Sequence, residues 1–99
     1  MTPTNVVSMN FKTASAMQEF IDVYEKDAPS LYPQAELLLL VKIDDASLIA
    51  VAAYPSEEGR LAAKKTAEER IEGHLAPLFK ENFRLVGDMV VKHQIKQPS

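Results

Sequence analysis

The chain contains no cysteine, which excludes disulfide bonds, a thiolate zinc site and a cysteine nucleophile. Its three glycines, at positions 59, 73 and 87, are too scattered to form a phosphate-binding loop. No apolar run approaches the roughly 18 residues of a membrane-spanning helix. Basic residues number 11 against 14 acidic ones, and the resulting net charge of −3 argues against a nucleic-acid-binding surface. We therefore expect neither a nucleic-acid nor a membrane partner, and no metal or other cofactor.

What the chain does have is ordinary globular composition. Its 99 residues are 46% hydrophobic and 25% charged, which predicts one folded domain spanning residues 1–99. Residues 1–5 carry neither the basic nor the apolar region of a secretion signal, so we expect a cytoplasmic protein.

The first strand is predicted over residues 6–12, where two unlike faces alternate. Val7, Met9 and Phe11 point one way, whereas Ser8 and Asn10 point the other. A polar side chain in such an apolar strand needs a hydrogen-bond partner where it is buried. Asn10 is therefore a candidate for orienting a ligand carbonyl, or an amide that is satisfied by the protein itself.

A helix is predicted to follow this strand. Ser15 and Gln18 have the spacing of a capping box, with Ser15 as the N-cap. Behind them lies an apolar stripe at helical spacing: Met17, Phe20, Ile21 and Tyr24. Pro29 is expected to end the helix near residue 27 or 28.

Two further strands are predicted as an antiparallel hairpin over residues 36–43 and 47–54, joined by a turn at residues 44–46. The first is an apolar run and is expected to be buried on both faces. In the second, one face carries Leu48, Ala50, Ala52 and Tyr54. The two Asp residues at 44 and 45 are typical of a turn.

The second helix is predicted to start at Ser56, the N-cap, and to bury this stripe: Ala63, Ala67, Ile71, Leu75 and Leu78. A basic cluster, comprising Arg60, Lys64, Lys65 and Arg70, is expected on a solvated helix face. Pro77 predicts a kink or a two-piece helix. A last strand is predicted over residues 86–95, with Met89, Val91, His93 and Ile95 on one face.

The order β-α-β-β-α-β predicts a ferredoxin-like α+β fold, in which two helices cover one face of a four-stranded antiparallel sheet. The other sheet face is expected to carry apolar residues: Val6, Leu38, Leu40, Ala50 and Ala52. A face of this kind is too apolar for contact with water, and so short a chain offers no third layer. We therefore predict a homodimer that packs sheet against sheet.

This chain resembles the dimeric α/β-barrel superfamily, and within it the antibiotic biosynthesis monooxygenase-like branch. The resemblance covers residues 6–94 and rests on the element order, the apolar run at 37–41, the small-residue strand at 49–54 and the Pro-Ser-Glu-Glu helix start. It implies a dimer that forms an α/β barrel and holds a hydrophobic or aromatic ligand between sheet and helices. Some members oxidise polyphenols without metal or flavin, and others degrade haem.

The residues expected to act on a phenolic or enolic substrate are Asn10, Tyr54 and His74. We expect Ser8, Leu38, Leu40 and His93 to line the ligand site, with His93 at either the pocket or the dimer seam. In haem-degrading relatives the site combines an Asn, a Trp and a helix His. Asn10 or Asn5 with His74 matches two of these, but the sequence has no tryptophan.

Three functions stay open on this evidence. The first is a dimer that binds a hydrophobic organic ligand and oxygenates it without a cofactor. The second is a non-catalytic binding or stress-associated dimer. The third is haem binding and degradation. Whether any ligand is converted or only bound is not decided by the sequence.

Overall fold

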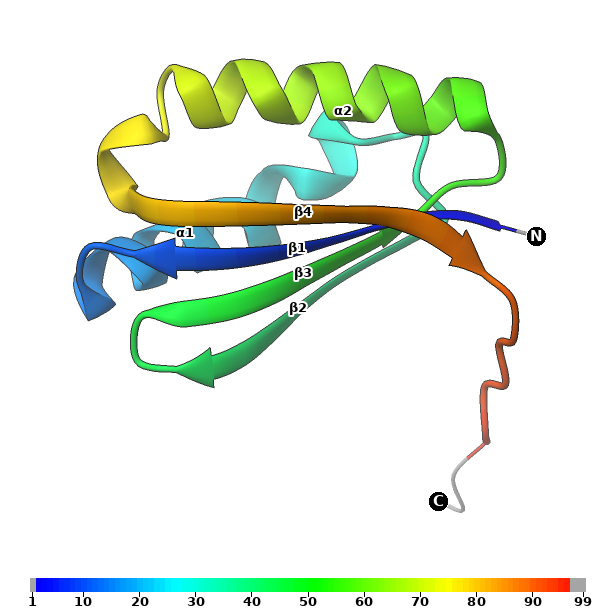
Figure 1. The fold of residues 1–99 in the computed structure, drawn as a ribbon, viewed down its shortest axis with the longest axis horizontal. Helices are drawn as coiled ribbons and strands as arrows, with labels where there is room; N and C mark the ends of the chain where they lie inside the picture. The colour runs from blue at the N-terminus through cyan, green and yellow to red at the C-terminus, as the bar shows by residue number, and fades with distance from the viewer. Residues whose placement is uncertain (1, 97–99) are drawn as a thin grey trace.

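The computed structural model describes residues 2–96 and has a ferredoxin-like fold (Figure 1). Its elements follow the predicted order: β1 (Thr2–Phe11), α1 (Ala14–Leu31), β2 (Leu37–Asp44), β3 (Ser47–Ala53), α2 (Glu57–Glu72), the 3-10 turn η1 (Ala76–Leu78) and β4 (Phe79–Met89). The four strands form one antiparallel sheet in the order β2-β3-β1-β4. The predicted fold class is thereby confirmed. Within the described residues, no helix is both long and apolar enough to cross a membrane.

The core lies between the sheet and the two helices, which share one side of the sheet (Figure 1). As predicted, Val7, Met9 and Phe11 of β1 face this core and are buried. Phe11 packs against Phe79 with ring centroids 4.9 Å apart, and Phe20 of α1 lies 5.3 Å from Phe11. This aromatic cluster fixes α1 and the start of β4 on the same end of the sheet.

Helix α1 differs from its predicted bounds at both ends. Its N-cap is Thr13, whose side chain accepts a hydrogen bond from the Ala16 amide at 3.0 Å, so the prediction of Ser15 was wrong. The helix also continues through Pro29 to Leu31 rather than ending at residue 27 or 28. A proline this close to the end removes one backbone donor, and the Tyr32 amide still closes the last turn on Ala28.

Helix α2 agrees with the prediction at its start. The Ser56 hydroxyl accepts a hydrogen bond from the Gly59 amide at 3.1 Å, as an N-cap does. Ala63 is buried in the predicted stripe, and Ile71 packs against the core. The helix ends at Glu72, and Pro77 lies in the separate turn η1, which is the two-piece arrangement expected from that proline.

Strand β4 runs from Phe79 to Met89, so the prediction of a strand over residues 86–95 was largely wrong. The reason lies in its neighbour: Met89 pairs with Thr2, where β1 starts, and the described residues offer β4 no further pairing beyond that point. Residues 90–96 lead away from the sheet (Figure 1). His93 consequently lies outside the sheet, exposed, and not on the predicted strand face.

The sheet face turned away from the helices is apolar. We call it the open face, and cross-strand register assigns to it Val6, Leu39, Val41, Ile49, Val51, Phe83 and Leu85. Of the residues predicted for this face, only Val6 lies there. Ala50 pairs with Val7 and therefore faces the core, together with Ala52, Leu38 and Leu40. Both faces of these strands are apolar, so alternation alone could not tell which one the helices cover.

Candidate functional site

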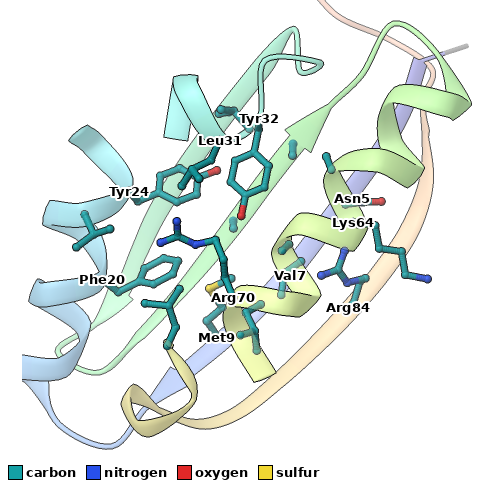
Figure 2. Close-up of a pocket in the computed structure, with 18 of the residues that line it drawn as sticks. Asn5, Val7, Met9, Phe20, Tyr24, Leu31, Tyr32, Lys64, Arg70 and Arg84 are labelled. Carbon is teal, nitrogen blue, oxygen red and sulfur yellow. The ribbon is translucent and has the colours of Figure 1, made fainter. Parts of the chain in front are cut away.

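A cavity of about 60 Å³ lies between the sheet and both helices. Its walls are mostly apolar and come from β1, the end of α1, β2, β3 and the inner side of α2; they include Val7, Leu31, Leu38, Ala52, Ala67 and Ile71. Figure 2 shows Tyr24, Tyr32 and Arg70 close together, from α1, its C-cap and α2, with Asn5 of β1 across α2 from them; all four line the cavity. A water molecule needs about 10–15 Å³ of such space, so the cavity has room for several waters or a small organic group.

Three tyrosines line the cavity: Tyr24 in α1, Tyr32 at its C-cap and Tyr54 after β3. We call them the tyrosine cluster. The Tyr24 ring lies 5.7 Å from Phe20 and 6.4 Å from Tyr32, which makes the cluster continuous with the aromatic core. Tyr54 is only 3% exposed. These rings give the cavity an aromatic wall with polar hydroxyl groups.

Burial raises the pKa of all three tyrosines above the ordinary value. For Tyr24, burial dominates, and Tyr32 and Tyr54 raise the pKa further. For Tyr32, burial raises the pKa while Arg70 and Arg84 act in the opposite direction. At neutral pH the cluster is therefore fully protonated, so its hydroxyls serve as hydrogen-bond donors and not as bases.

The charged residues that line the cavity are Lys64 and Arg70 from α2 and Arg84 from β4. Figure 2 shows Arg70 extending from α2 toward Tyr32, with Arg84 and Lys64 on the far side of the helix. All three side chains are half-buried. The prediction of a solvated helix face was therefore wrong for Arg70, whereas Lys64, which pairs with Glu68 and has a side chain 43% exposed, is partly solvated. Both residues line the cavity from opposite edges of the buried side of α2. Arg84 was missed because its strand was predicted to start two residues later.

Asn5 supplies the remaining polar group of the cavity. It lies on β1, is only 4% exposed, and its Oδ1 atom is buried without a hydrogen-bond partner among the described residues. An unpaired buried acceptor costs about 1–3 kcal/mol. Such a group calls for an explanation, and a ligand that donates a hydrogen bond would satisfy it.

The predicted site residues do not all meet at this cavity. Tyr54 and Leu38 line it, and Leu40 packs beside it against the core. Asn10 and Ser8 lie on the open face, where the Asn10 Oδ1 accepts a hydrogen bond from the Ser47 hydroxyl at 2.7 Å. This leaves the amide satisfied within the protein, which is the alternative considered for it from the sequence.

The two histidines also lie apart from the cavity. His74 is exposed in the turn between α2 and η1 and is not among the lining residues, and His93 lies beyond β4. Their roles in binding or catalysis, and that of Asn10, stay predictions. No group of three or more His, Cys, Asp or Glu side chains in residues 2–96 is placed to hold a metal ion.

No family model and no curated protein matches this chain. Solved structures do match it over nearly its whole length. A dimeric ferredoxin-like protein from an uncultured marine organism has a TM-score of 0.74 and 13% identity, covering 96% of this chain and 93% of its own.

Two further structures have names that refer to oxygenation. A candidate antibiotic biosynthesis monooxygenase from Nitrosomonas europaea has a TM-score of 0.73 and 11% identity, covering 90% of both chains. A mutant of SnoaB, a cofactor-independent oxygenase from Streptomyces nogalater, has a TM-score of 0.70 and 19% identity, covering 92% of this chain and 95% of its own. This chain thus shares the fold of dimeric ferredoxin-like proteins and of antibiotic biosynthesis monooxygenase-like proteins, as the sequence resemblance predicted.

Proposed function

We propose that this protein is a homodimer that binds a small, mainly apolar organic molecule in the cavity between its sheet and helices. The observation that carries the binding role is the unpaired Asn5 acceptor in an otherwise apolar and aromatic cavity. Small-molecule sites typically combine apolar walls with a few well-placed polar groups. An internal packing defect would not be expected to bring hydroxyls, guanidinium groups and an unsatisfied amide together.

The dimer is supported by the surface of the single protomer. It exposes 6645 Å², whereas a monomer of 11.0 kDa is expected to expose about 5,600 Å². Residues 90–96, which lead away from the sheet, contribute to this excess of about 1,000 Å², and the rest is of the order that each partner buries in an interface of standard size, roughly 800 Å². The exposed apolar open face accounts for part of it, and a similar fold is described as dimeric.

Ligand binding can be tested through the tyrosines. The chain has no tryptophan and three tyrosines, and all three line the cavity, so near-ultraviolet circular dichroism of tyrosine reports on this site. We expect a saturable change on titration with a neutral phenol such as 4-hydroxybenzamide.

The matched variants are Ala67→Leu and Ala62→Leu, which make the same substitution on the same helix. Ala67 lines the cavity, whereas Ala62 is exposed outside it. Filling the cavity in Ala67→Leu should weaken binding, and Ala62→Leu should bind like the wild type. Equal binding by the two variants, or an unchanged tyrosine signal, would contradict a ligand site here.

A second candidate is cofactor-independent oxygenation of the bound molecule. It is favoured by the fold shared with SnoaB and by the protonated Tyr54 hydroxyl in the cavity wall. The lining residues include no His, Asp or Glu, so the substrate would enter already ionised. In the reaction, a substrate CH₂ group and O₂ would give a carbonyl group and water.

Oxygen uptake during incubation with phenolic compounds that carry a ring CH₂ group acidic enough to ionise at neutral pH tests this reaction. Consumption of one O₂ for each carbonyl formed, with a slower rate in Tyr54→Phe, is the expected result. Uptake that is lost in His74→Ala but not in Tyr54→Phe would favour the role predicted for His74 instead. If no oxygen is consumed, the protein would bind the ligand without converting it. The cavity volume, about 60 Å³, argues against haem as its ligand.

A further inference from the structure

The cavity is positively charged in a protein that is negatively charged as a whole. The net charge of the chain is −3, yet the charged side chains that line the cavity are Lys64, Arg70 and Arg84, and no Asp or Glu is among the lining residues. Lys64 has a carboxylate partner, Glu68, at 3.7 Å. Within residues 2–96, neither Arg70 nor Arg84 makes a salt bridge. Two guanidinium groups at the cavity therefore lack a counter-anion.

Two half-buried guanidinium groups without a counter-anion are unfavourable unless an opposite charge compensates for their lost hydration. Charges that are partly removed from water are normally paired with an opposite charge. A guanidinium group matches a carboxylate geometrically, with two parallel hydrogen bonds. Both arginines favour a lower pKa for Tyr32, against the effect of burial. Their positive potential therefore reaches the aromatic wall of the cavity. A ligand anion in that place would be stabilised by the same potential.

The remaining polar groups limit the kind of anion. With no His, Asp or Glu among the lining residues, the cavity has no ordinary base to remove a proton from the ligand. An anion bound here must therefore already be ionised before it binds, as carboxylic acids are at neutral pH and simple phenols are not. The unpaired Oδ1 of Asn5 accepts hydrogen bonds, so the complementary ligand also carries a donor such as a hydroxyl group.

We infer that the molecule bound in this cavity is a small organic carboxylate with an apolar body and a hydroxyl group, held by Arg70, Arg84 and Asn5. This inference rests on the ligand-binding function proposed above and specifies its substrate class. The free space is about 60 Å³, smaller than the roughly 150 Å³ of an engineered cavity that holds benzene. The ligand therefore has no more than one ring, part of which lies in the mouth of the cavity.

Calorimetric titration with two nearly isosteric ligands tests the inference. The acid is 4-hydroxybenzoate, and its neutral counterpart is 4-hydroxybenzamide. We expect the dimeric wild-type protein to bind the acid at least about tenfold more tightly, since charge-assisted hydrogen bonds are roughly twice as strong as neutral ones. This preference should decrease as the salt concentration rises.

Charge-removing variants identify the residues responsible. Arg70→Gln and Arg84→Gln should each weaken binding of the acid by about tenfold or more and weaken binding of the amide by a clearly smaller factor, because the amide carbonyl accepts only neutral-type hydrogen bonds. The matched controls are Lys65→Gln on α2 and Lys80→Gln on β4, which remove the same charge from exposed positions outside the cavity. Both controls should retain the wild-type preference for the acid.

Several results would overturn the inference. Equal affinity of the wild type for acid and amide would remove the anion preference but leave the ligand-binding function standing. The absence of binding by both compounds would count against the inference and the proposed function together. If an arginine variant fails to fold, the comparison of acid and amide binding by the wild-type protein still tests the preference for an anion. An equal loss of acid binding in the lysine controls would mean that the chain's general charge, rather than these two arginines, holds the ligand.

Discussion

Dimerisation through the open face can be tested with a single substitution, Leu85→Lys. Leu85 lies on β4 beside Val6 and is 56% exposed in the protomer. Full burial of a leucine side chain stabilises by about 1.5–3 kcal/mol, so covering the exposed part is worth about 1–2 kcal/mol in each protomer. A two-fold interface contains the residue twice. The substitution should therefore cost about 2–4 kcal/mol of association free energy, which raises the dissociation constant about 30- to 700-fold.

The assay is sedimentation equilibrium at micromolar concentration, where the wild type should have about twice the 11.0 kDa mass of one chain. Leu85→Lys should sediment as the monomer. Leu61→Lys is the control, because Leu61 is 55% exposed on α2 and lies on the helix side of the sheet. A dimeric Leu85→Lys protein, a monomeric wild type or equal weakening by both substitutions would refute packing through the open face.

Three other predictions concern the folded protomer. First, absorbance titration should give apparent pKa values for the tyrosine cluster above the usual value near 10. Because the pKa values are raised in the folded state, the tyrosines contribute their full stabilisation below the unfolded-state pKa and lose it as the pH rises through the folded-state pKa values. Tyrosines that titrate normally would contradict their burial. Second, Leu48→Ala, at a side chain only 1% exposed, should cost about 2–5 kcal/mol in urea unfolding at fixed protein concentration. A loss below about 1 kcal/mol would mean that the site is not in the core. Third, Thr13→Ala should cost about 1 kcal/mol and Ser15→Ala almost nothing, and the reverse order would restore Ser15 as the cap.

The fold was predictable because the sequence patterns are local and consistent. Val7, Met9 and Phe11 alternate with polar residues on β1, and this pattern alone assigns the buried face. Ser56 signals the start of α2 through its hydroxyl and the acidic residues that follow. Asp44, whose Oδ1 accepts from the Ala46 amide at 2.9 Å, marks the β2–β3 turn.

Strand β4 was misplaced because strand formation depends on a partner as well as on side-chain preference. Its first half, residues 79–85, is rich in charged residues and has a weak strand signal, yet it pairs with β1 from Phe11 onward. Residues 90–95 have the stronger alternation, but the pairing of β4 with β1 extends only to Met89, opposite Thr2, within the described residues. The apolar side chains of Val90, Val91 and Ile95 are accordingly exposed.

The cavity was predictable only in part, because its residues come together from six elements. Tyr54 was found from its place at the end of a strand, and Leu38 from its apolar run. Arg70 lies in a helix rich in charged residues, where no sequence pattern distinguishes a cavity arginine from a solvated one. Arg84 alternates with Phe83 and Leu85, and that alternation was the available signal for an inward-facing arginine.

The most direct test of the cavity as a ligand site is methyl-resolved NMR during titration of the dimer with 4-hydroxybenzoate. The cavity methyl groups of Leu38, Ala67 and Ile71 should shift together and saturate, because an aromatic ring enters their surroundings. The open-face methyl groups of Val6 and Val51 should stay unchanged in the same spectra. Shifts confined to Val6 and Val51, or no saturable shift at Leu38, Ala67 and Ile71, would contradict a ligand site between the sheet and the helices.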